Sequence, residues 1–422
     1  MSDPIEGTVR DFSRFGEGVV LTSSGVVFVP GVLPGERVEL TDVRPRGKGV
    51  LFTDKVRLLD PSTQRQDPVC PIVGRCGGCP MMIASPKLEL RFKRDLLEGA
   101  LKGLAGEADV RRGWVAPVKT LGYRRRARLA WSAVRGRSRI GYRRPRSTEV
   151  TDVRGCAVLD ERLDRALGKL RSALGPHLAG EGQMHLAMGE GSGVVVALRS
   201  EAPQAPALYG ALEALVGDGT LVGAALRAGG ASVDAIWGKP REVREGGDGK
   251  PLVGTVAGFS QAHDEVNRAL VGRVVELAAP AERDVLELFA GAGNLTVALA
   301  ASAGSLVAIE QDEAAAEACR ENLRARGLAA TVRSADAQTW RPPAVPEVVV
   351  LDPPRTGAQG AIQRLVKLGP KEIVYVSCDP PTLRRDLETL TKAGWVPTDA
   401  VALDMFPQTA HVECVVRLVK PG

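Results

Sequence analysis

The chain has 422 residues, of which 44% are hydrophobic and 25% are charged, with a net charge of +6. This length exceeds what one compact core supports, so about three domains are expected, and the composition can bury substantial cores. The apolar runs are too short for a membrane span, and the start MSDPIEGTVR has no apolar signal region. We therefore expect a cytoplasmic protein with no membrane contact, and nothing in the sequence indicates an obligate protein partner.

Residues 5–60 alternate apolar and polar positions between turn signals such as Gly16, Gly18 and Pro34–Gly35. Many short strands in so few residues predict a small closed β-barrel, because closure removes exposed strand edges. The stretch resembles the TRAM domain, an RNA-binding barrel related to the OB fold. The resemblance implies a first domain over residues 1–62 that binds RNA, while a barrel without a binding role is the alternative.

An irregular loop is expected over residues 61–85, and it carries Cys70, Cys76 and Cys79, with a fourth thiol at Cys156 in VRGCAVLD. In a reducing compartment, such a cluster indicates a metal site rather than disulfides. Four thiolates can hold either a zinc ion or an iron–sulfur cluster. The residues alone leave both possibilities open.

A central domain is expected over residues 63–255. It begins with this loop and a predicted helix over 87–104, and a strand pair is expected in MHLAMGEGSGVVVALRS. Between Arg124 and Arg146 the sequence carries ten arginines and no acidic residue, with Trp131 and Tyr142 interspersed. Guanidinium groups punctuated by aromatic rings favour contact with nucleic acid over a merely solvated surface.

From about Val266 the pattern changes to a regular alternation of strands and helices, which predicts an α/β catalytic domain over residues 256–422. It should contain a mostly parallel, Rossmann-like sheet with helices on both faces. Helices should separate the first five strands, whereas the last two should form an antiparallel hairpin. The expected strands lie at 284–289, 305–309, 347–351, 372–376, 399–403 and 412–419.

The first of these strands leads into the glycine-rich turn of FAGAGNLTVALA, where Gly291 and Gly293 let the backbone approach a ligand. Glu310 ends the next strand, where a carboxylate can accept both ribose hydroxyls of a nucleoside, and Asp336 follows in RSADAQ. No phosphate-binding loop follows, which disfavours a triphosphate. S-adenosylmethionine, a nucleoside without phosphates, fits better, and helix capping by these acids is the alternative.

Two polar motifs stand at the carboxyl ends of later strands, DPPR at 352–355 and SCDP at 377–380. Open sheets bind their ligands at these ends, so Cys378 is a candidate nucleophile rather than a packing thiol. One reaction that needs a thiol at such a position is substitution at carbon 5 of uracil. Carbon 5 becomes nucleophilic only after a group adds to carbon 6, and a thiolate adds there readily and leaves again. A base must then remove the proton on carbon 5. Glu413 in PQTAHVECVV is the candidate, with His411 as the alternative.

The sequence motifs DPPRTG at 352–357, VSCDPPTLRRD at 376–386 and FPQTAHVE at 406–413 resemble those of the RNA uracil-5 methyltransferases. That family includes a transfer-RNA enzyme and iron–sulfur ribosomal enzymes. The resemblance implies that Cys378 is the nucleophile and that Glu413 is the proton acceptor. It also implies S-adenosylmethionine contacts from Gln261, Phe289, Asn294, Glu310, Asp336 and Asp352.

The C-x5-C-x2-C spacing around Gly77–Gly78 resembles the four-iron cluster of the ribosomal members. The resemblance implies a [4Fe–4S] cluster on Cys70, Cys76, Cys79 and Cys156, and 23S ribosomal RNA as the substrate. Transfer RNA is the main alternative substrate. Cytosine-5 methylation is disfavoured because those enzymes carry a Pro-Cys motif after the strand that corresponds to 347–351, where this chain has Arg355. The intact Cys378 and Glu413 disfavour a non-catalytic RNA-binding iron–sulfur protein.

Overall fold

The computed structural model describes residues 4–47, 49–134 and 136–421, which divide into two compact units. The N-terminal unit runs from the start of the described chain to Leu96 and includes Tyr142–Thr151 and Phe406–His411. The large unit contains Leu97–Gly141, Asp152–Met405 and the chain from Val412 onward. Among the described residues, no helix is long and apolar enough to cross a membrane.

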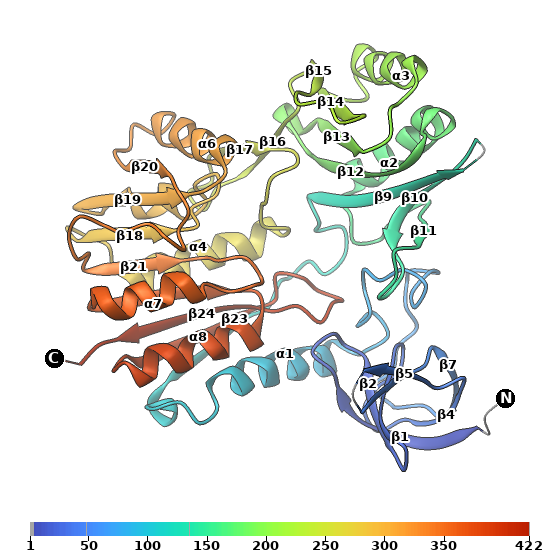
Figure 1. The fold of residues 1–422 in the computed structure, drawn as a ribbon, viewed down its shortest axis with the longest axis horizontal. Helices are drawn as coiled ribbons and strands as arrows, with labels where there is room; N and C mark the ends of the chain where they lie inside the picture. The colour runs from blue at the N-terminus through green and yellow to red at the C-terminus, as the bar shows by residue number, and fades with distance from the viewer. Residues whose placement is uncertain (1–3, 48, 135, 422) are drawn as a thin grey trace. The chain divides into compact units, whose positions relative to one another are not determined.

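The N-terminal unit begins with several short β-strands (Figure 1). Along strands such as β2 and β4, fully buried residues alternate with more exposed ones. The inward side chains, including Val9, Val20 and Leu40, form one core. The hydrogen-bonded order of the described strands is β5-β6-β3-β2-β1-β4-β7, so β5 and β7 are the ends of the ladder. The strands are β1 Ile5–Phe12, β2 Gly18–Thr22, β3 Gly25–Val29, β4 Arg37–Thr41, β5 Arg44–Gly47, β6 Val50–Phe52 and β7 Lys55–Asp60.

The expected irregular segment over residues 61–85 is confirmed, because no helix or strand lies between β7 and helix α1 (Pro86–Leu101) in this described stretch. Its last residues are buried with the first turns of α1. Met81, Ile83 and Phe92 belong to one apolar cluster of the N-terminal unit, and Ala410 joins them from the distant segment 406–411.

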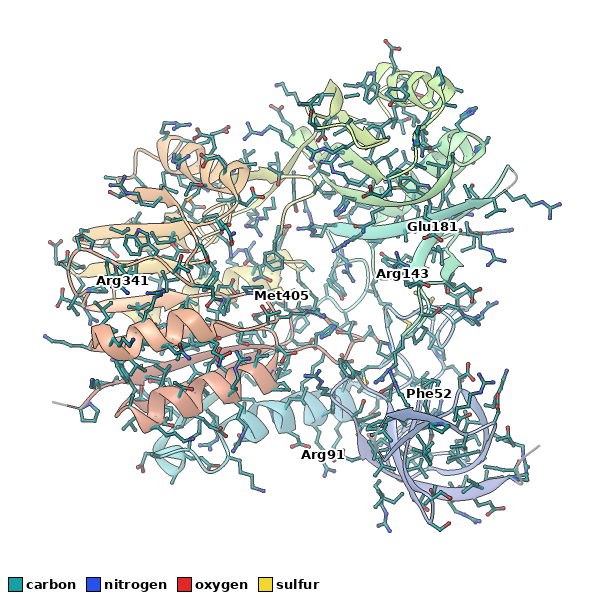
Figure 2. The ribbon with its side chains drawn as sticks, in the orientation of Figure 1. Phe52, Arg91, Arg143, Glu181, Arg341 and Met405 are labelled. Carbon is teal, nitrogen blue, oxygen red and sulfur yellow. The ribbon has the colours of Figure 1, made fainter. Side chains whose placement is uncertain are left out.

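The middle of the chain forms a sheet with the order β11-β10-β9-β12-β13-β14-β15. The predicted strand pair is confirmed as β12 and β13, which pair antiparallel. Leucines of α2 and α3 are buried against this sheet, and Glu181 marks the start of β12 (Figure 2). The elements are β9 Arg126–Val134, β10 Arg137–Arg143, β11 Val150–Asp152, α2 Glu161–Leu174, β12 Gly180–Met188, β13 Val194–Ser200, α3 Pro206–Gly217, β14 Gly223–Ala228 and β15 Ala235–Gly238. A separate hairpin of β16 (Arg241–Glu245) and β17 (Pro251–Thr255) follows.

The C-terminal part of the large unit contains the predicted sheet, in the order β20-β19-β18-β21-β22-β24-β23-β8. The five strands from β20 to β22 are parallel, and the antiparallel pairing of β23 with β24 confirms the predicted hairpin. The strands are β8 Arg111–Val115, β18 Asp284–Leu288, β19 Ser305–Glu310, β20 Thr331–Ser334, β21 Val348–Leu351, β22 Glu372–Ser377, β23 Val396–Leu403 and β24 Glu413–Val419.

Helices cover both faces of this sheet, as predicted, with α4 on one face and α7 and α8 on the other (Figure 1). The helices are α4 Asp264–Ala278, α5 Thr296–Leu299, α6 Glu313–Arg324, α7 Gln359–Leu368 and α8 Pro380–Lys392. Helices separate the first five expected strands, as predicted. Strand β20 is additional to the expected strands, and residues 335–347, which join it to β21, contain no helix in the described chain. That segment contains three prolines, Pro342, Pro343 and Pro346, which cannot continue a helix.

Candidate active site

Three chemically active side chains stand at neighbouring strand ends in the large unit. Asp352 follows β21, Cys378 follows β22, and Glu413 begins β24. The strands β21, β22 and β24 are adjacent in the sheet, and Ser377 pairs with Cys414 in the antiparallel register. Continuing that register by one residue places Cys378 opposite Glu413. The structure therefore brings together the predicted nucleophile and the predicted base.

The Cys378 thiol is half-buried, and its surroundings oppose ionisation. Burial raises the pKa of this thiol to about 12, and the negative charge of Glu413 is the next largest cause. The guanidinium of Arg355 acts in the opposite direction, through its charge and a hydrogen bond. Arg355, the residue that replaces a Pro-Cys motif in DPPR, is therefore the group that favours the thiolate.

Burial also raises the pKa of both carboxyl groups of the site. Burial raises the pKa of Glu413 well above its usual range, with the charge of Asp352 as the second cause and Arg355 opposing. Burial raises the pKa of Asp352 to about 7, opposed by Arg244. Because each negative charge disfavours the others, protonation of the carboxyls makes it easier for Cys378 to ionise.

The glycine-rich turn after β18 has the shape expected for a ligand-binding loop. Gly291 has φ +56°, and a side chain there would meet open space, whereas a side chain at Gly293 would lie 2.8 Å from the Cys319 sulfur. The amide of Gly291 donates a 2.8 Å hydrogen bond to Glu310, and the amide of Asp312 donates another of 2.8 Å. Glu310 is thus held in a fixed orientation beside the turn.

Unpartnered buried atoms support a polar ligand near this turn. Gln261 and Glu287 are at most 4% exposed. The side-chain oxygen of Gln261 and one carboxyl oxygen of Glu287 are buried without a hydrogen bond. Burying such groups costs free energy unless a ligand completes them. The fixed Glu310, the open turn and these oxygens fit a nucleoside cofactor such as S-adenosylmethionine.

The other predicted cofactor contacts take different positions. Phe289 adopts φ +65°, an unusual value for a residue with a side chain, at the start of the turn. Asn294 exchanges two hydrogen bonds of 2.8 and 3.0 Å with Asn267, which ties the turn to α4. Asp336 is half-buried after β20 and accepts a 2.8 Å hydrogen bond from the amide of Gln338.

One residue of the site escaped the sequence reasoning. Arg244 lies on β16, is 7% exposed, and has a terminal nitrogen buried without a hydrogen bond. Its charge opposes the upward shift of the Asp352 pKa. No sequence signal identifies it, because its role depends on the folding of a hairpin, and more than 100 residues separate Arg244 from Asp352.

The four candidate metal ligands are half-buried. Cys70, Cys76 and Cys79 lie in the N-terminal unit, and Cys156 lies in the large unit, where its amide donates a 2.7 Å hydrogen bond to Asp164. Within the described ranges, no group of three or more His, Cys, Asp or Glu side chains is arranged to hold a metal ion. The loop thiols do not by themselves form a ligand group, and the cluster stays a prediction.

The arginine run is divided by the fold. Arg126 is mostly buried, donates to the Gly258 carbonyl and to Ser260 at 2.8 Å, and is unavailable to a large ligand. Arg128, by contrast, is exposed and lies directly opposite His185 in the pairing of β9 with β12. Arg137 and Arg139 on β10 are also exposed, and their pairing with Val134 and Ser132 places them on the same face of the sheet as Arg128.

The arginines of this face contribute to a lowered pKa of the histidine that lies among them. Burial lowers the pKa of His185 to about 4, and the charges of Arg128, Arg126 and Arg199 contribute further. The opposite face carries apolar residues such as Leu129, Met184 and Leu198, all fully or nearly fully buried. We call the exposed arginines Arg128, Arg137 and Arg139 the basic sheet face.

Known proteins resemble this chain over nearly its whole length. Residues 345–421 match the tRNA (Uracil-5-)-methyltransferase family, and residues 254–373 match the methyltransferase small domain. The 23S rRNA (uracil(1939)-C(5))-methyltransferase RlmD of Alkalilimnicola ehrlichii is 34% identical over 97% of this chain and 95% of its own length. The crystal structure of Pyrococcus abyssi tRNA (uracil-54, C5)-methyltransferase with S-adenosyl-L-homocysteine has a TM-score of 0.78, 23% identity, and covers 98% of this chain and 100% of its own.

Proposed function

This chain belongs to the family of S-adenosylmethionine-dependent RNA uracil-C5 methyltransferases, and we propose that it methylates carbon 5 of a uridine in 23S ribosomal RNA. The observation that carries the proposal is the placement of Cys378 opposite Glu413 at adjacent strand ends. The ribosomal substrate is supported by the 23S rRNA methyltransferase of Alkalilimnicola ehrlichii, because its similarity to this chain covers almost the full length of both proteins. We place the reaction in the cytoplasm, where the thiols remain reduced.

The residues of the site divide the chemistry between them. The Cys378 thiolate adds to carbon 6 of uracil, and the electron pair of the ring double bond becomes available at carbon 5. S-adenosylmethionine supplies the electrophilic methyl group that carbon 5 then accepts. Glu413 removes the proton from carbon 5, and the returning electron pair restores the double bond as the bond from carbon 6 to sulfur breaks. Gln261, Phe289, Asn294, Glu310, Asp336 and Asp352 are proposed to hold the cofactor.

The substrate is tested by mapping methylated uridines by mass spectrometry in RNA from a strain lacking this protein. We expect one 5-methyluridine to disappear from 23S ribosomal RNA and to return when the wild-type chain is expressed. Expression of Cys378→Ala provides the matched control and should restore nothing. Loss of 5-methyluridine from transfer RNA alone would replace the proposed substrate with transfer RNA.

We also propose that Cys70, Cys76, Cys79 and Cys156 hold a [4Fe–4S] cluster, because four thiolates suit it and three of them share one loop. Anaerobically purified protein should be brown, with about four irons per chain. Serine at any of the four positions should bleach it, whereas Cys319→Ala, a buried thiol elsewhere, should not. Stoichiometric zinc without iron would contradict the assignment.

The basic sheet face is proposed to bind RNA phosphates. Replacing Arg128, Arg137 and Arg139 together with glutamine should weaken RNA binding and flatten the dependence of log K on log salt by about 2, as expected for three contacts with single-stranded phosphates. The measurement is a salt titration of binding. Arg273, Arg320 and Arg324, which pair with glutamates on α4 and α6, supply the control triple variant. An unchanged slope in the first variant would mean that the face is only solvated.

We propose the division into three domains that the sequence predicts. We propose that residues 1–62 form a TRAM-like RNA-binding domain, residues 63–255 the cluster and RNA-binding domain, and residues 256–422 the catalytic domain. One strand crosses this scheme, because β8 at Arg111–Val115 pairs parallel with β23 and extends the catalytic sheet. The central segment thereby contributes to the catalytic sheet.

A further inference from the structure

The N-terminal unit contains a cavity of about 430 Å³ that the methyl-transfer site does not include. This volume is within the range of small-ligand sites. Its walls come from separate parts of the chain: the β1–β2 turn with Phe15, β5 with Arg46, the cysteine loop over residues 73–80, Arg146, and the segment 409–411. We call this cavity the stacking pocket.

An exposed aromatic ring lies at the stacking pocket. Phe15 is 47% exposed, so part of its ring is accessible from solvent. The guanidinium carbons of Arg14 and Arg146 lie 4.5 and 5.0 Å from its ring centroid. The guanidinium carbon of Arg46 lies 5.2 Å from the ring centroid of Phe52 on β6. Aromatic rings and guanidinium planes are the groups on which proteins stack unpaired bases.

The charges in the stacking pocket suit an anion. Glu17 is 6% exposed, accepts a hydrogen bond from Arg146, and lies 3.7 Å from Arg46. It is the acidic residue of the lining, against two guanidiniums. One carboxylate cannot neutralise both guanidinium groups. Positive charge therefore remains for a phosphate, which a guanidinium can bind in a bidentate manner.

The backbone around the stacking pocket is held in unusual conformations. Arg146 has φ +54°, a left-handed value that a side chain disfavours, and strained residues cluster at ligand sites. Gly16 has φ +76°, and a side chain there would come within 3.2 Å of Ala410. A side chain at Gly77 would lie 3.0 Å from the Arg143 carbonyl oxygen. These close approaches fix the walls rather than leaving them to adapt.

We propose that the stacking pocket binds one nucleotide of the substrate RNA other than the target uridine. Its base would stack beside Phe15, and its phosphate would contact Arg46 and Arg146. Stacking and phosphate contact are tolerant of base identity, so the pocket adds affinity and register. Segment 409–411 lines the pocket and leads to Glu413 two residues later. The proposal rests on the RNA methylation proposed above.

Binding of a 23S ribosomal RNA transcript to full-length variants tests this proposal. Phe15→Ala should weaken binding roughly 5- to 150-fold, which corresponds to one lost base stack. Phe15→Leu keeps apolar bulk, yet it should behave like Phe15→Ala because leucine has no π face on which a base can stack. Phe15→Trp should bind at least as tightly as wild type. Leu21→Ala, another exposed apolar residue of the same unit, is the matched control with wild-type affinity.

A second measurement addresses the phosphate. Arg146→Gln should flatten the salt dependence of log K by about 0.7, the value of one single-stranded phosphate contact. Wild-type affinity in Phe15→Ala, or in Phe15→Leu, overturns the stacking pocket. If the wild-type chain methylates the transcript in that case, the proposed function stands. If no uridine is methylated yet Phe15→Ala still weakens binding, the function fails and the pocket stands.

Discussion

Replacing Cys378 with alanine is expected to abolish both methyl transfer and covalent attachment to RNA. The thiol follows β22 opposite Glu413, and a thiolate can both add to carbon 6 and leave again. Activity should fall by several orders of magnitude, as happens when a covalent enzyme loses its nucleophile. Transfer of labelled methyl groups from S-adenosylmethionine to a 23S ribosomal RNA transcript measures the loss.

Covalent attachment is measured separately with RNA that contains 5-fluorouridine. Fluorine at carbon 5 cannot leave as a cation, so the wild-type enzyme should stop as a protein–RNA adduct on denaturing electrophoresis. Cys378→Ala should form none. Cys414→Ala is the matched control, because this second thiol is fully buried on β24 and burial raises its pKa far above the usual range. An adduct that persists in Cys378→Ala and vanishes in Cys414→Ala would reassign the nucleophile.

The catalytic sheet could be predicted because each of its central strands has a clear local sequence signal. Strands such as β21 and β22 are continuous apolar runs, and a chemical motif follows each of them at the ligand-binding edge. The order of strands then brings Asp352, Cys378 and Glu413 together. Sequence reasoning could therefore select the candidate reacting residues without knowing how the middle of the chain folds.

Features that depend on distant partners could not be predicted. Strand β8 is a half-exposed RRGWV segment, and it becomes part of the catalytic sheet only by pairing with β23, nearly 300 residues later. The arginine run shows the same limit. Arg126 and Arg128 point to one face of β9, yet Gly258 and Ser260 cover only Arg126. The number of arginines could be counted in the sequence, whereas their exposure to solvent could be known only from the folded structure.

Glu413→Gln is expected to transfer the methyl group and then stall. The amide keeps the shape of the side chain and cannot accept the proton on carbon 5, so the bond from carbon 6 to sulfur cannot break. The substitution also removes a negative charge that raises the pKa of Cys378, so formation of the thiolate should become easier. Addition and methylation should therefore proceed while elimination stops. The variant should accumulate one methylated adduct per active site.

Denaturing electrophoresis with labelled S-adenosylmethionine and unmodified RNA reveals this species as a shifted, labelled band that is absent from Cys378→Ala. Glu413→Asp keeps a carboxylate with a shorter reach and should turn over slowly without accumulating much adduct. The pH dependence follows from the shifted pKa. Because burial places the pKa of Glu413 well above its usual range, the elimination step should slow as the pH falls through that value. Turnover of Glu413→Gln at the wild-type rate would show that another residue removes the proton, and His411→Ala would then be the next variant to measure.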